Sequence, residues 1–568
     1  MNELIIPSIS SMLRVEPSIE AINHGGLPMV IEPSKEAHRI RRVLPQSVGK
    51  HLESKVLVCE THNKEIAILV TESFATSPQV AQVKIAMGRR HPGMRVEVHP
   101  VTPLELLEYS KSNGELLGSE RQASSSYGRA LEDIVKFAVD NDASDITLDI
   151  NYDQPMSPIS YKIAGRQIRL DDWRMATPRL EEIVNIAWQE VAGGAHSSFD
   201  KDVESQGIYT LPVDQRQFKL RFQSIITDTG PSISLRLLEQ GVVKKLDAYG
   251  YLDTHLNLLK RYKNSRNGLI GISGKVDSGK TTGISAVIDT LPEHYKVFML
   301  EDPVEILLAG VYQITVARPV DGSGDANYAM KLMALKRVAP DAVSIGEIRD
   351  HLNAKAITDV GGMGTLGFFT LHASCMLHIP QKLWSESIGV PRDFLSSPGM
   401  FKLLAHQALV PRLCSCAKPI HSLTQEGGLD NEGDFQDGAH WQQYIQGIET
   451  AFKIDASSMK VRNHLGCEKC HNPYFNDLNG YAGRQPIAEM IEPNKHYELL
   501  RLIGQGDTLG MYEYFDTLPR EKLDHEDMTN KTIVECGLYL ALQGKLDPRD
   551  IEQATEPFAN LILQPRYR

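Results

Sequence analysis

Hydrophobic and polar positions along the chain follow one kind of pattern before residue 245. Residues 131–138 carry apolar side chains at the spacing of one helix face. The segments 159–163, 217–222 and 232–238 alternate apolar and polar residues, which is typical of half-buried β-strands. This part of the sequence therefore predicts a small α+β domain.

A different pattern occupies the second half of the chain. Apolar runs at 268–273, 297–300 and 342–345 alternate with helix-compatible segments, one beginning at Lys280 and another at 326–338. Strands that alternate with helices predict a parallel sheet with helices on both faces. The predicted fold class is therefore α/β.

These patterns divide the sequence into four predicted domains. The first is an N-terminal accessory domain, separated from the second by a Ser- and Gly-rich segment at 112–126 that predicts a linker. The second is the smaller α+β domain, the third is the α/β core, and the fourth contains two cysteine pairs and a helical tail. Their predicted bounds are 1–120, 121–245, 246–411 and 412–568.

Composition narrows the classes of function. The chain has 568 residues and a net charge of −12, so it lacks the basic excess that a dedicated nucleic-acid binder usually carries. No apolar run approaches the ~20 residues of a membrane-spanning helix, and the first residues lack the charged and apolar regions of a secretory signal. We therefore expect a cytoplasmic protein with no direct nucleic-acid partner, which reaches a membrane only through other proteins.

Residues 274–281 follow the pattern G-x4-G-K-T, between an apolar strand and a helix. Glycines in such a loop allow backbone N–H groups to surround phosphate oxygens, and the helix directs its positive end at them. Lys280 is expected to neutralise the terminal phosphates, and the Thr281 hydroxyl to bind Mg²⁺. Asp277 is an unusual carboxylate in a loop that receives polyphosphate. The predicted nucleotide-binding residues are Gly274, Ser278, Gly279, Lys280, Thr281 and Thr282.

Two acidic stretches follow strands of the predicted sheet. Glu301 and Glu305 belong to the segment EDPVE, and Glu347 follows the apolar run 342–345. In an open parallel sheet, ligands bind at the carboxyl ends of strands. Acids that emerge there beside a phosphate loop can orient attacking water and hold a metal ion.

These motifs occur in an order that resembles one family, the ATPases of type II secretion and type IV pilus machines (the GspE/PilB/PilT group). The resemblance covers about residues 127–500 and implies a RecA-like ATPase core. Its motifs are ASDITLD (143–149), EDPVE (301–305), PDAVSIGEIRD (340–350), GTLGFFTLH (364–372) and GCEKC…GYAGRQPIAEM (466–490).

The resemblance implies a role for individual residues. Glu305 is expected to orient the attacking water, Glu347 to belong to the Mg²⁺ shell, and His372 to approach the phosphates. Arg221 and Arg236 align with two arginines that act as fingers on the bound nucleotide. The family has a further histidine where this chain has Thr365.

The four paired cysteines predict a metal site. Cys467 and Cys470 have the C-x-x-C spacing of a zinc half-site, and Cys414 and Cys416 form a tighter C-x-C pair. The resemblance implies a structural Zn²⁺ held by all four. His464 or His471 replacing one thiolate, and a pair of metal-free thiols, are alternatives.

The leading functional hypothesis is a homo-hexameric motor that hydrolyses ATP with Mg²⁺ on the cytoplasmic side of the inner membrane. The resemblance implies that it powers type IV pilus or type II secretion pseudopilus assembly, with residues 1–120 docking on an inner-membrane platform protein. One alternative is a type IV secretion or conjugative-transfer ATPase of the VirB type. Another is a nucleotide-binding scaffold without turnover, which Asp277 and Thr365 favour.

Overall fold

The computed structural model describes residues 40–44, 56–61, 65–71, 74–75, 77–101, 119–191, 199–241, 244–316, 325–431, 433–472 and 475–561. Much of the predicted accessory domain, including residues 1–39 and 102–118, lies outside the described residues. The chain divides into two compact units, which we call unit 1 (Met1–Leu237) and unit 2 (Leu238–Arg568). Each unit has its own sheets and core.

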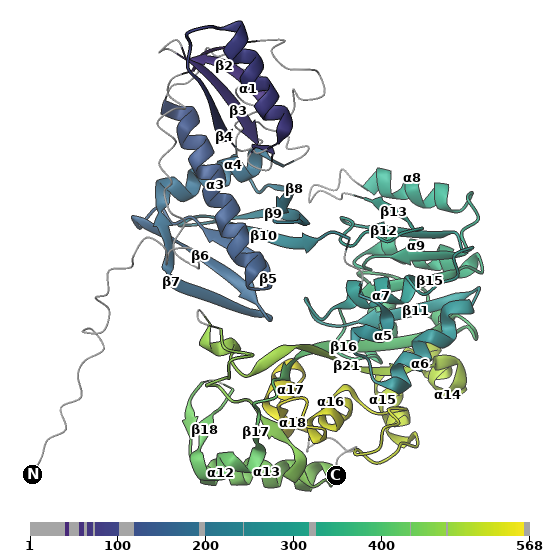
Figure 1. The fold of residues 1–568 in the computed structure, drawn as a ribbon. Coiled ribbons are helices and arrows are strands. Elements are labelled where there is room, and N and C mark those ends of the chain that lie inside the picture. The colour runs from purple at the N-terminus through teal and green to yellow at the C-terminus, as the bar shows by residue number, and fades with distance from the viewer. Residues whose placement is uncertain are drawn as a thin grey trace, which may run out of the picture. The chain divides into compact units, whose positions relative to one another are not determined.

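Unit 1 begins with a four-stranded sheet in the order β1-β2-β3-β4, in which only the pair β3 and β4 is parallel (Figure 1). Helix α1 connects these two strands and buries Val80, Val83 and Met87 in the same apolar core as the strands. The elements are β1 Ile40–Val43, β2 Val56–Thr61, β3 Ile66–Thr71, α1 Pro78–Arg90 and β4 Val96–Val101.

The second sheet of unit 1 has six strands in the order β7-β6-β5-β10-β9-β8. Along β9, Phe218, Leu220 and Phe222 are buried and alternate with more exposed residues, because successive side chains of a strand point to opposite faces. The elements are α3 Ser119–Asp140, β5 Ala143–Asp149, β6 Met156–Ile163, β7 Arg166–Ala176, α4 Thr177–Gln189, β8 Gln206–Val213, β9 Arg216–Thr227 and β10 Gly230–Glu239. The strands predicted from alternation at 159–163, 217–222 and 232–238 lie within β6, β9 and β10.

The predicted linker at 112–126 is wrong in its second part. Helix α3 begins at Ser119, and residues 112–118 lie outside the described residues. Ser and Gly favour linkers, but Glu120, Arg121 and Gln122 are good helix formers that extend the amphipathic helix towards its N-terminus.

Unit 2 is built on a seven-stranded sheet in the order β13-β12-β14-β15-β11-β16-β21. Six strands are parallel, and β21 pairs antiparallel with β16 at one edge. The strands are β11 Gly268–Ser273, β12 Val297–Glu301, β13 Tyr312–Thr315, β14 Ala342–Ile345, β15 Leu366–Leu371, β16 Phe401–Leu413 and β21 Tyr481–Ile491.

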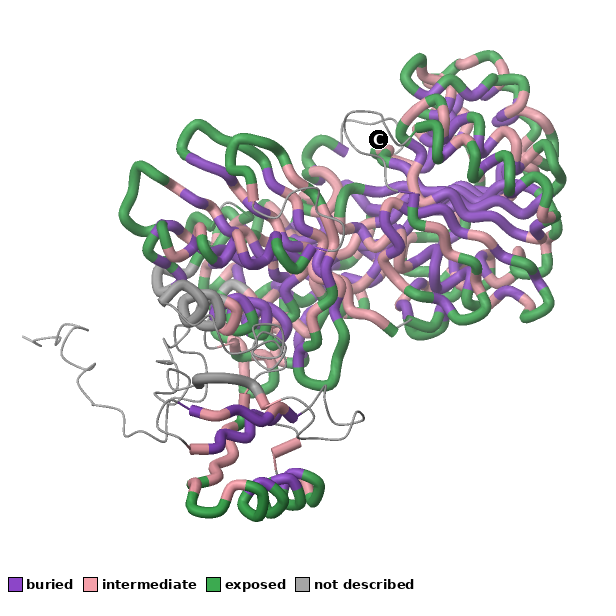
Figure 2. The backbone as a smooth tube through the Cα atoms, turned by 90° about the horizontal axis from the view of Figure 1, so that it is seen from above, coloured by how far each residue is buried: buried purple, intermediate pink, exposed green. Residues whose placement is uncertain are grey.

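Both faces of this sheet are covered by apolar cores, as the strand–helix alternation predicts. Leu269 belongs to the core on one face and the adjacent Ile270 to the core on the other. Figure 2 shows the strands as a buried band with exposed segments outside it. The helices of this part are α5 Leu246–Tyr249, α6 Asp253–Arg261, α7 Lys280–Ile288, α8 Asp325–Leu335, α9 His351–Gly362, α10 His378–Trp384 and α11 Arg392–Ser396.

The paired strands β16 and β21 are connected by the long segment 414–480, which contains all four paired cysteines. The predicted boundary at 411/412 falls within β16, and β21 completes the sheet of the preceding region. The remaining elements are β17 Lys418–Pro419, α12 Leu423–Glu426, β18 Gly428–Leu429, β19 Phe435–Gln436, α13 Gly438–Phe452, β20 Lys460–Val461, α14 Tyr497–Gln505, α15 Thr508–Thr517, α16 Ile533–Leu542, α17 Pro548–Ala554 and α18 Phe558–Leu561.

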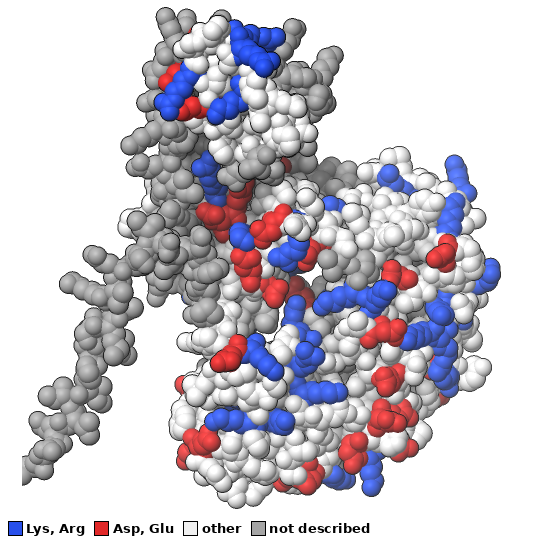
Figure 3. All heavy atoms as spheres, viewed as in Figure 1, with Lys and Arg blue, Asp and Glu red and all other residues white. Residues whose placement is uncertain are grey.

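Two surface properties bear on possible partners. Among the described residues, no helix combines the length and the apolar character that crossing a membrane requires. On the face of unit 2 drawn in Figure 3, Lys and Arg side chains lie interspersed with Asp and Glu side chains.

Candidate functional site

The predicted phosphate loop lies between the end of β11 and the start of α7. Gly279 precedes the helix with φ of +79°, a left-handed conformation that favours glycine. Gly274 has no room for a side chain, because a Cβ there would lie 2.4 Å from the Gln407 carbonyl oxygen. The loop therefore has the strand–loop–helix setting that phosphate binding requires, with the first N–H groups of α7 free of helical partners.

Lys280 is the first residue of α7, and its side chain is buried against the loop. Its Nζ donates to the carbonyl oxygens of Gly274 at 2.9 Å and Lys275 at 2.7 Å. Burial lowers the pKa of Lys280, and the carboxylates of Glu347, Asp277 and Glu305 oppose that shift. Three predicted or suspected carboxylates thus act electrostatically on this one ammonium group.

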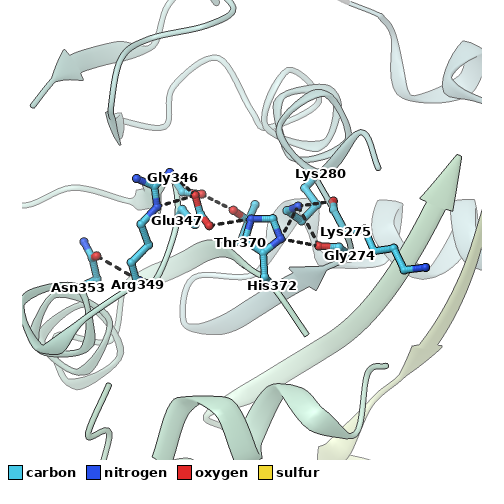
Figure 4. Close-up of polar contacts among 9 residues, drawn as sticks. All are labelled: Gly274, Lys275, Lys280, Gly346, Glu347, Arg349, Asn353, Thr370 and His372. Atoms are coloured by element: carbon cyan, nitrogen blue, oxygen red, sulfur yellow. Dashed lines mark hydrogen bonds and ion pairs between the residues drawn. The ribbon is translucent and has the colours of Figure 1, made fainter. Parts of the chain in front are cut away.

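His372 connects the loop to the acid that follows β14 (Figure 4). Its Nδ1 lies 2.9 Å from the Gly274 carbonyl oxygen, and its Nε2 lies 2.9 Å from Oε1 of Glu347. Nδ1 is also 3.4 Å from Nζ of Lys280. Lys280, His372 and Glu347 therefore form one contiguous polar chain.

Glu347 leaves the carboxyl end of β14 and is held on its other oxygen by Arg349. The Arg349 Nε donates to Oε2 of Glu347 at 2.8 Å. Asp350 caps α9, because its Oδ1 accepts from the N–H groups of Leu352 at 2.9 Å and Asn353 at 3.1 Å. Glu347 therefore contacts His372, whereas Asp350 caps the next helix, α9.

The segment after β12 places its two glutamates differently. Glu301 is buried, and its Oε1 accepts from Gln313 at 3.0 Å, whereas Glu305 is half-buried. The backbone carbonyl of Glu305 accepts from Gln240 at 3.2 Å. Glu305 is thus the more exposed of the two carboxylates, and it acts electrostatically on Lys280.

The remaining predicted loop residues lie at the start of α7. Thr281 and Thr282 are half-buried in its first turn. The buried Ser278 hydroxyl has no hydrogen-bond partner among the described residues. Asp277 has φ of +63°, which Asp tolerates better than most side chains.

Thr365 does not belong to this edge of the sheet. It precedes β15, whereas His372 follows it, and Leu371 at the carboxyl end of that strand pairs with Ser273 beside the loop. The Thr365 hydroxyl donates to the Pro340 carbonyl at 3.4 Å. Six strand residues, or ~20 Å, separate Thr365 from His372 at the other end of β15.

Arg221 and Arg236 belong to unit 1, on the neighbouring strands β9 and β10. Both are partly exposed; Leu220 and Phe222 on either side of Arg221 are buried, and so is Leu235 before Arg236. The Arg236 Nε donates to Oδ1 of Asp145 at 2.8 Å.

The cysteines predicted to bind a metal converge in space. The four Sγ atoms of Cys414, Cys416, Cys467 and Cys470 all lie within 4.8 Å of one another. Three of the separations are 3.8, 3.6 and 3.7 Å, close to the ~3.8 Å edge of a tetrahedron with Zn–S bonds of about 2.3 Å.

Backbone groups favour thiolates in this cluster. The Sγ of Cys470 accepts from the N–H groups of Cys467 and Gly480, both at 3.2 Å. A backbone hydrogen bond from Cys416 lowers the pKa of the Cys414 thiol to about 6, whereas burial and the neighbouring cysteines raise the pKa of Cys416 to about 12. The donor set, its spacing and its charge therefore suit Zn²⁺ without a histidine.

With this geometry in place, the sequence matches the model of the Type II/IV secretion system protein family over residues 120–521. The chain belongs to this family. The type II secretion system protein E of Pectobacterium carotovorum subsp. carotovorum is 27% identical to it over 368 residues, which are 64% of this chain and 65% of that protein. The type IV pilus assembly ATPase PilB of Pseudomonas aeruginosa is 25% identical over 60% of this chain and 53% of that protein.

The family resemblance predicted from the motifs is thereby confirmed. The match covers somewhat less than two thirds of the length of the Pectobacterium protein. Among solved structures, the X-ray structure of the Legionella pneumophila ATPase DotB is 17% identical, with a TM-score of 0.47, over 74% of this chain and 94% of that chain.

Two residues of this family member that contact the loop were missed by the sequence analysis. Gln407 on β16 and Tyr249 on α5 bind loop carbonyl groups. A signal for Gln407 does exist, since His406 and Gln407 interrupt the apolar run 403–410. Tyr249 has no comparable signal, because a tyrosine among apolar residues is ordinary core.

Proposed function

We propose that the chain is an ATP-hydrolysing motor that powers assembly of a type IV pilus or of a type II secretion pseudopilus. In this proposal it acts as a homo-hexamer on the cytoplasmic side of the inner membrane, and residues 1–120 dock on a platform protein. Family membership and the names of the relatives support the motor. The observation that carries the proposal is the polar chain from Lys280 through His372 to Glu347 beside the loop.

Each residue of the site has a proposed task. The N–H groups at the start of α7 and the Lys280 ammonium bind the β- and γ-phosphates. Mg²⁺, when bound, would offset phosphate charge, with the Thr281 hydroxyl and Glu347 in or near its shell. Glu305 accepts a hydrogen bond from the attacking water and orients it.

His372 is proposed to sense the phosphate end of the nucleotide. The His372 ring contacts the Gly274 carbonyl on one side and Glu347 on the other. A movement of either group therefore changes a contact of the same side chain. Lys280 must leave the carbonyl oxygens of Gly274 and Lys275 to reach a phosphate, which frees Nδ1 of His372 from its ammonium neighbour.

The decisive experiment measures phosphate release by the purified protein and by Lys280→Ala and Glu347→Gln. We expect both variants to lose at least about a hundredfold in turnover, because each removes transition-state charge stabilisation. Lys275→Ala is the matched control: this lysine lies in the same loop, but its amine is exposed and donates to the Ala554 carbonyl at 3.3 Å. Equal background rates in all four proteins would leave a nucleotide-binding scaffold and reject the motor.

We also propose that Cys414, Cys416, Cys467 and Cys470 hold one structural Zn²⁺. The four-cysteine geometry supports this role. The cluster joins the end of β16 to the turn before β21, so the metal would close the base of the segment 414–480. No thiolate remains for catalysis at such a site, because a four-thiolate zinc ion has no open position.

A further inference from the structure

Two carbonyl groups of the phosphate loop are held by side chains from outside the loop. Gln407 donates through Nε2 to the Ser278 carbonyl at 2.7 Å and to the Tyr249 hydroxyl at 3.2 Å. That hydroxyl donates to the Gly279 carbonyl at 2.8 Å, and Tyr251 donates to Oε1 of Gln407. Both ends of the Gln407 amide therefore have partners, which fixes its orientation.

These carbonyl groups share their peptide planes with two N–H groups of the loop. The Ser278 carbonyl belongs to the peptide that carries the Gly279 N–H, and the Gly279 carbonyl to the peptide that carries the Lys280 N–H. In a planar trans peptide the C=O and N–H bonds point in opposite directions. Holding the two carbonyls therefore helps to direct both N–H groups away from them, out of the N-terminal end of α7, where the Gly279 carbonyl also accepts from the Gly283 N–H at 2.8 Å.

The fold brings these side chains to the loop by strand length. β11 ends at Ser273, which pairs with His406, whereas β16 continues to Leu413. Gln407 is thus the first β16 residue beyond the end of β11, at the level of the loop. Tyr249 closes the short helix α5.

Two glycines provide the space for the tyrosine hydroxyls. A Cβ at Gly279 would lie 2.4 Å from the Tyr249 hydroxyl, and a Cβ at Gly283, inside α7, would lie 2.9 Å from the Tyr251 hydroxyl. Burial raises the pKa of Tyr249 to about 12 and raises that of Tyr251 as well, so both hydroxyls keep their protons at neutral pH. A glycine within a helix lowers helix stability. The close approach of the Tyr251 hydroxyl explains why Gly283 nevertheless stands inside α7.

We propose that Gln407 and Tyr249 are positioning residues that aim the N–H groups of Gly279 and Lys280 at the phosphates of the bound nucleotide. They act through the Ser278 and Gly279 carbonyls and do not touch the ligand themselves. The inference rests on the proposed nucleotide-binding function of this loop.

The test measures the Kd of the full-length protein for Mg–ADP, with the Tm of the nucleotide-free protein as a second readout. Tyr249→Phe removes one neutral hydrogen bond to the loop, and we expect an affinity about fivefold lower. Gln407→Met removes both donors of the amide, and we expect a loss of about tenfold or more. In turnover assays, KM for ATP should rise more than kcat falls, because the two N–H groups bind phosphate in the ground state too.

Tyr295→Phe is the matched control. Tyr295 is also a buried tyrosine of unit 2, and its hydroxyl also donates to a backbone carbonyl, that of Asn264 at 3.4 Å. A Tyr249→Phe protein with the Kd of Tyr295→Phe, within twofold, would overturn the inference, whatever its Tm. If the unaltered protein fails to bind Mg–ADP at all, the proposed function is rejected instead.

Discussion

His255 is a titratable side chain enclosed within unit 2, on α6. It is 1% exposed, and its Nε2 has no hydrogen-bond partner among the described residues. Burial lowers the pKa of His255 to about 4, and the Asp527 carboxylate opposes this only in part. Below the unfolded value of ~6.5 the unfolded chain binds a proton that the folded protein excludes. The stability that this histidine contributes is therefore complete above that pH and is lost as the pH falls towards 4.

Between pH 7 and pH 5 the free energy of unfolding falls by about 2 kcal/mol through this one histidine, which corresponds to roughly 3 °C in Tm for a unit of this size. We expect His255→Gln to show a smaller Tm decrease between these pH values than the unaltered protein, measured by differential scanning calorimetry. His440→Gln is the control, because His440 is exposed at the start of α13. Equal pH dependence in all three proteins would contradict the assignment.

The site residues differ in how far the sequence predicts them. Lys280 and Gly274 belong to one short sequence motif. Their positions in the site can be predicted from that motif, the strand before it and the helix after it. Glu347 and His372 come from separate strands, and their contact depends on β14 and β15 being neighbours. The contact of Gln407 with the loop depends on strand register, which no local pattern specifies.

At the scale of elements, the proposed zinc site lies at the base of the long connection between β16 and β21. We expect the purified protein to contain about one Zn²⁺ per chain, measured by plasma mass spectrometry, and Cys470→Ser to lose most of it. Cys470 is the informative position, because its Sγ also accepts two backbone hydrogen bonds. Hydrogen exchange should rise within 414–480 and stay unchanged in β11 and β15.

Cys375→Ser serves as the control for this variant. Cys375 lies outside the cluster, and serine preserves a partner for the Tyr512 hydroxyl, 2.9 Å from its Sγ. Full zinc content in Cys470→Ser, or zinc loss in Cys375→Ser, would reject the four-cysteine site. Local rather than global opening is expected, because Trp441, Ile445 and Ile448 of the connection also pack in an apolar core shared with Ile487 of β21.

Elements were predictable where one side faces a core and the other faces water. The alternating strands β6, β9 and β10 follow this rule, since burial of one face fixes their period. The strands of unit 2 were predictable for another reason: both faces of their sheet are buried, so they are continuous apolar runs. The start of α3 was not predictable, because Ser and Gly suit a linker and a helix end alike. The antiparallel partner of β16 was not predictable either, since 67 residues (414–480) separate the two strands in sequence.

At the scale of the whole molecule, the site residues divide between the two units. The loop, Glu305, Glu347 and His372 belong to unit 2, and Arg221 and Arg236 to unit 1. If the two arginines stabilise charge that develops during phosphate transfer, as the family resemblance implies, they affect turnover and not ground-state affinity. Arg221→Ala and Arg236→Ala should then lower kcat at least about a hundredfold while leaving the Kd for Mg–ADP within twofold. Arg216→Ala, on the same strand as Arg221, should change neither.

Arg236 has a structural partner that this prediction must separate from a catalytic role. Its guanidinium pairs with Asp145, whose side chain is only 9% exposed, so Arg236→Ala leaves a nearly buried carboxylate without this partner and should lower Tm. Asp145→Asn combined with Arg236→Ala removes that charge, and we expect it to recover most of the Tm loss. If the arginine serves phosphate transfer, the double variant recovers stability and still fails to hydrolyse ATP. Recovery of turnover together with Tm would mean that Arg236 only neutralises Asp145.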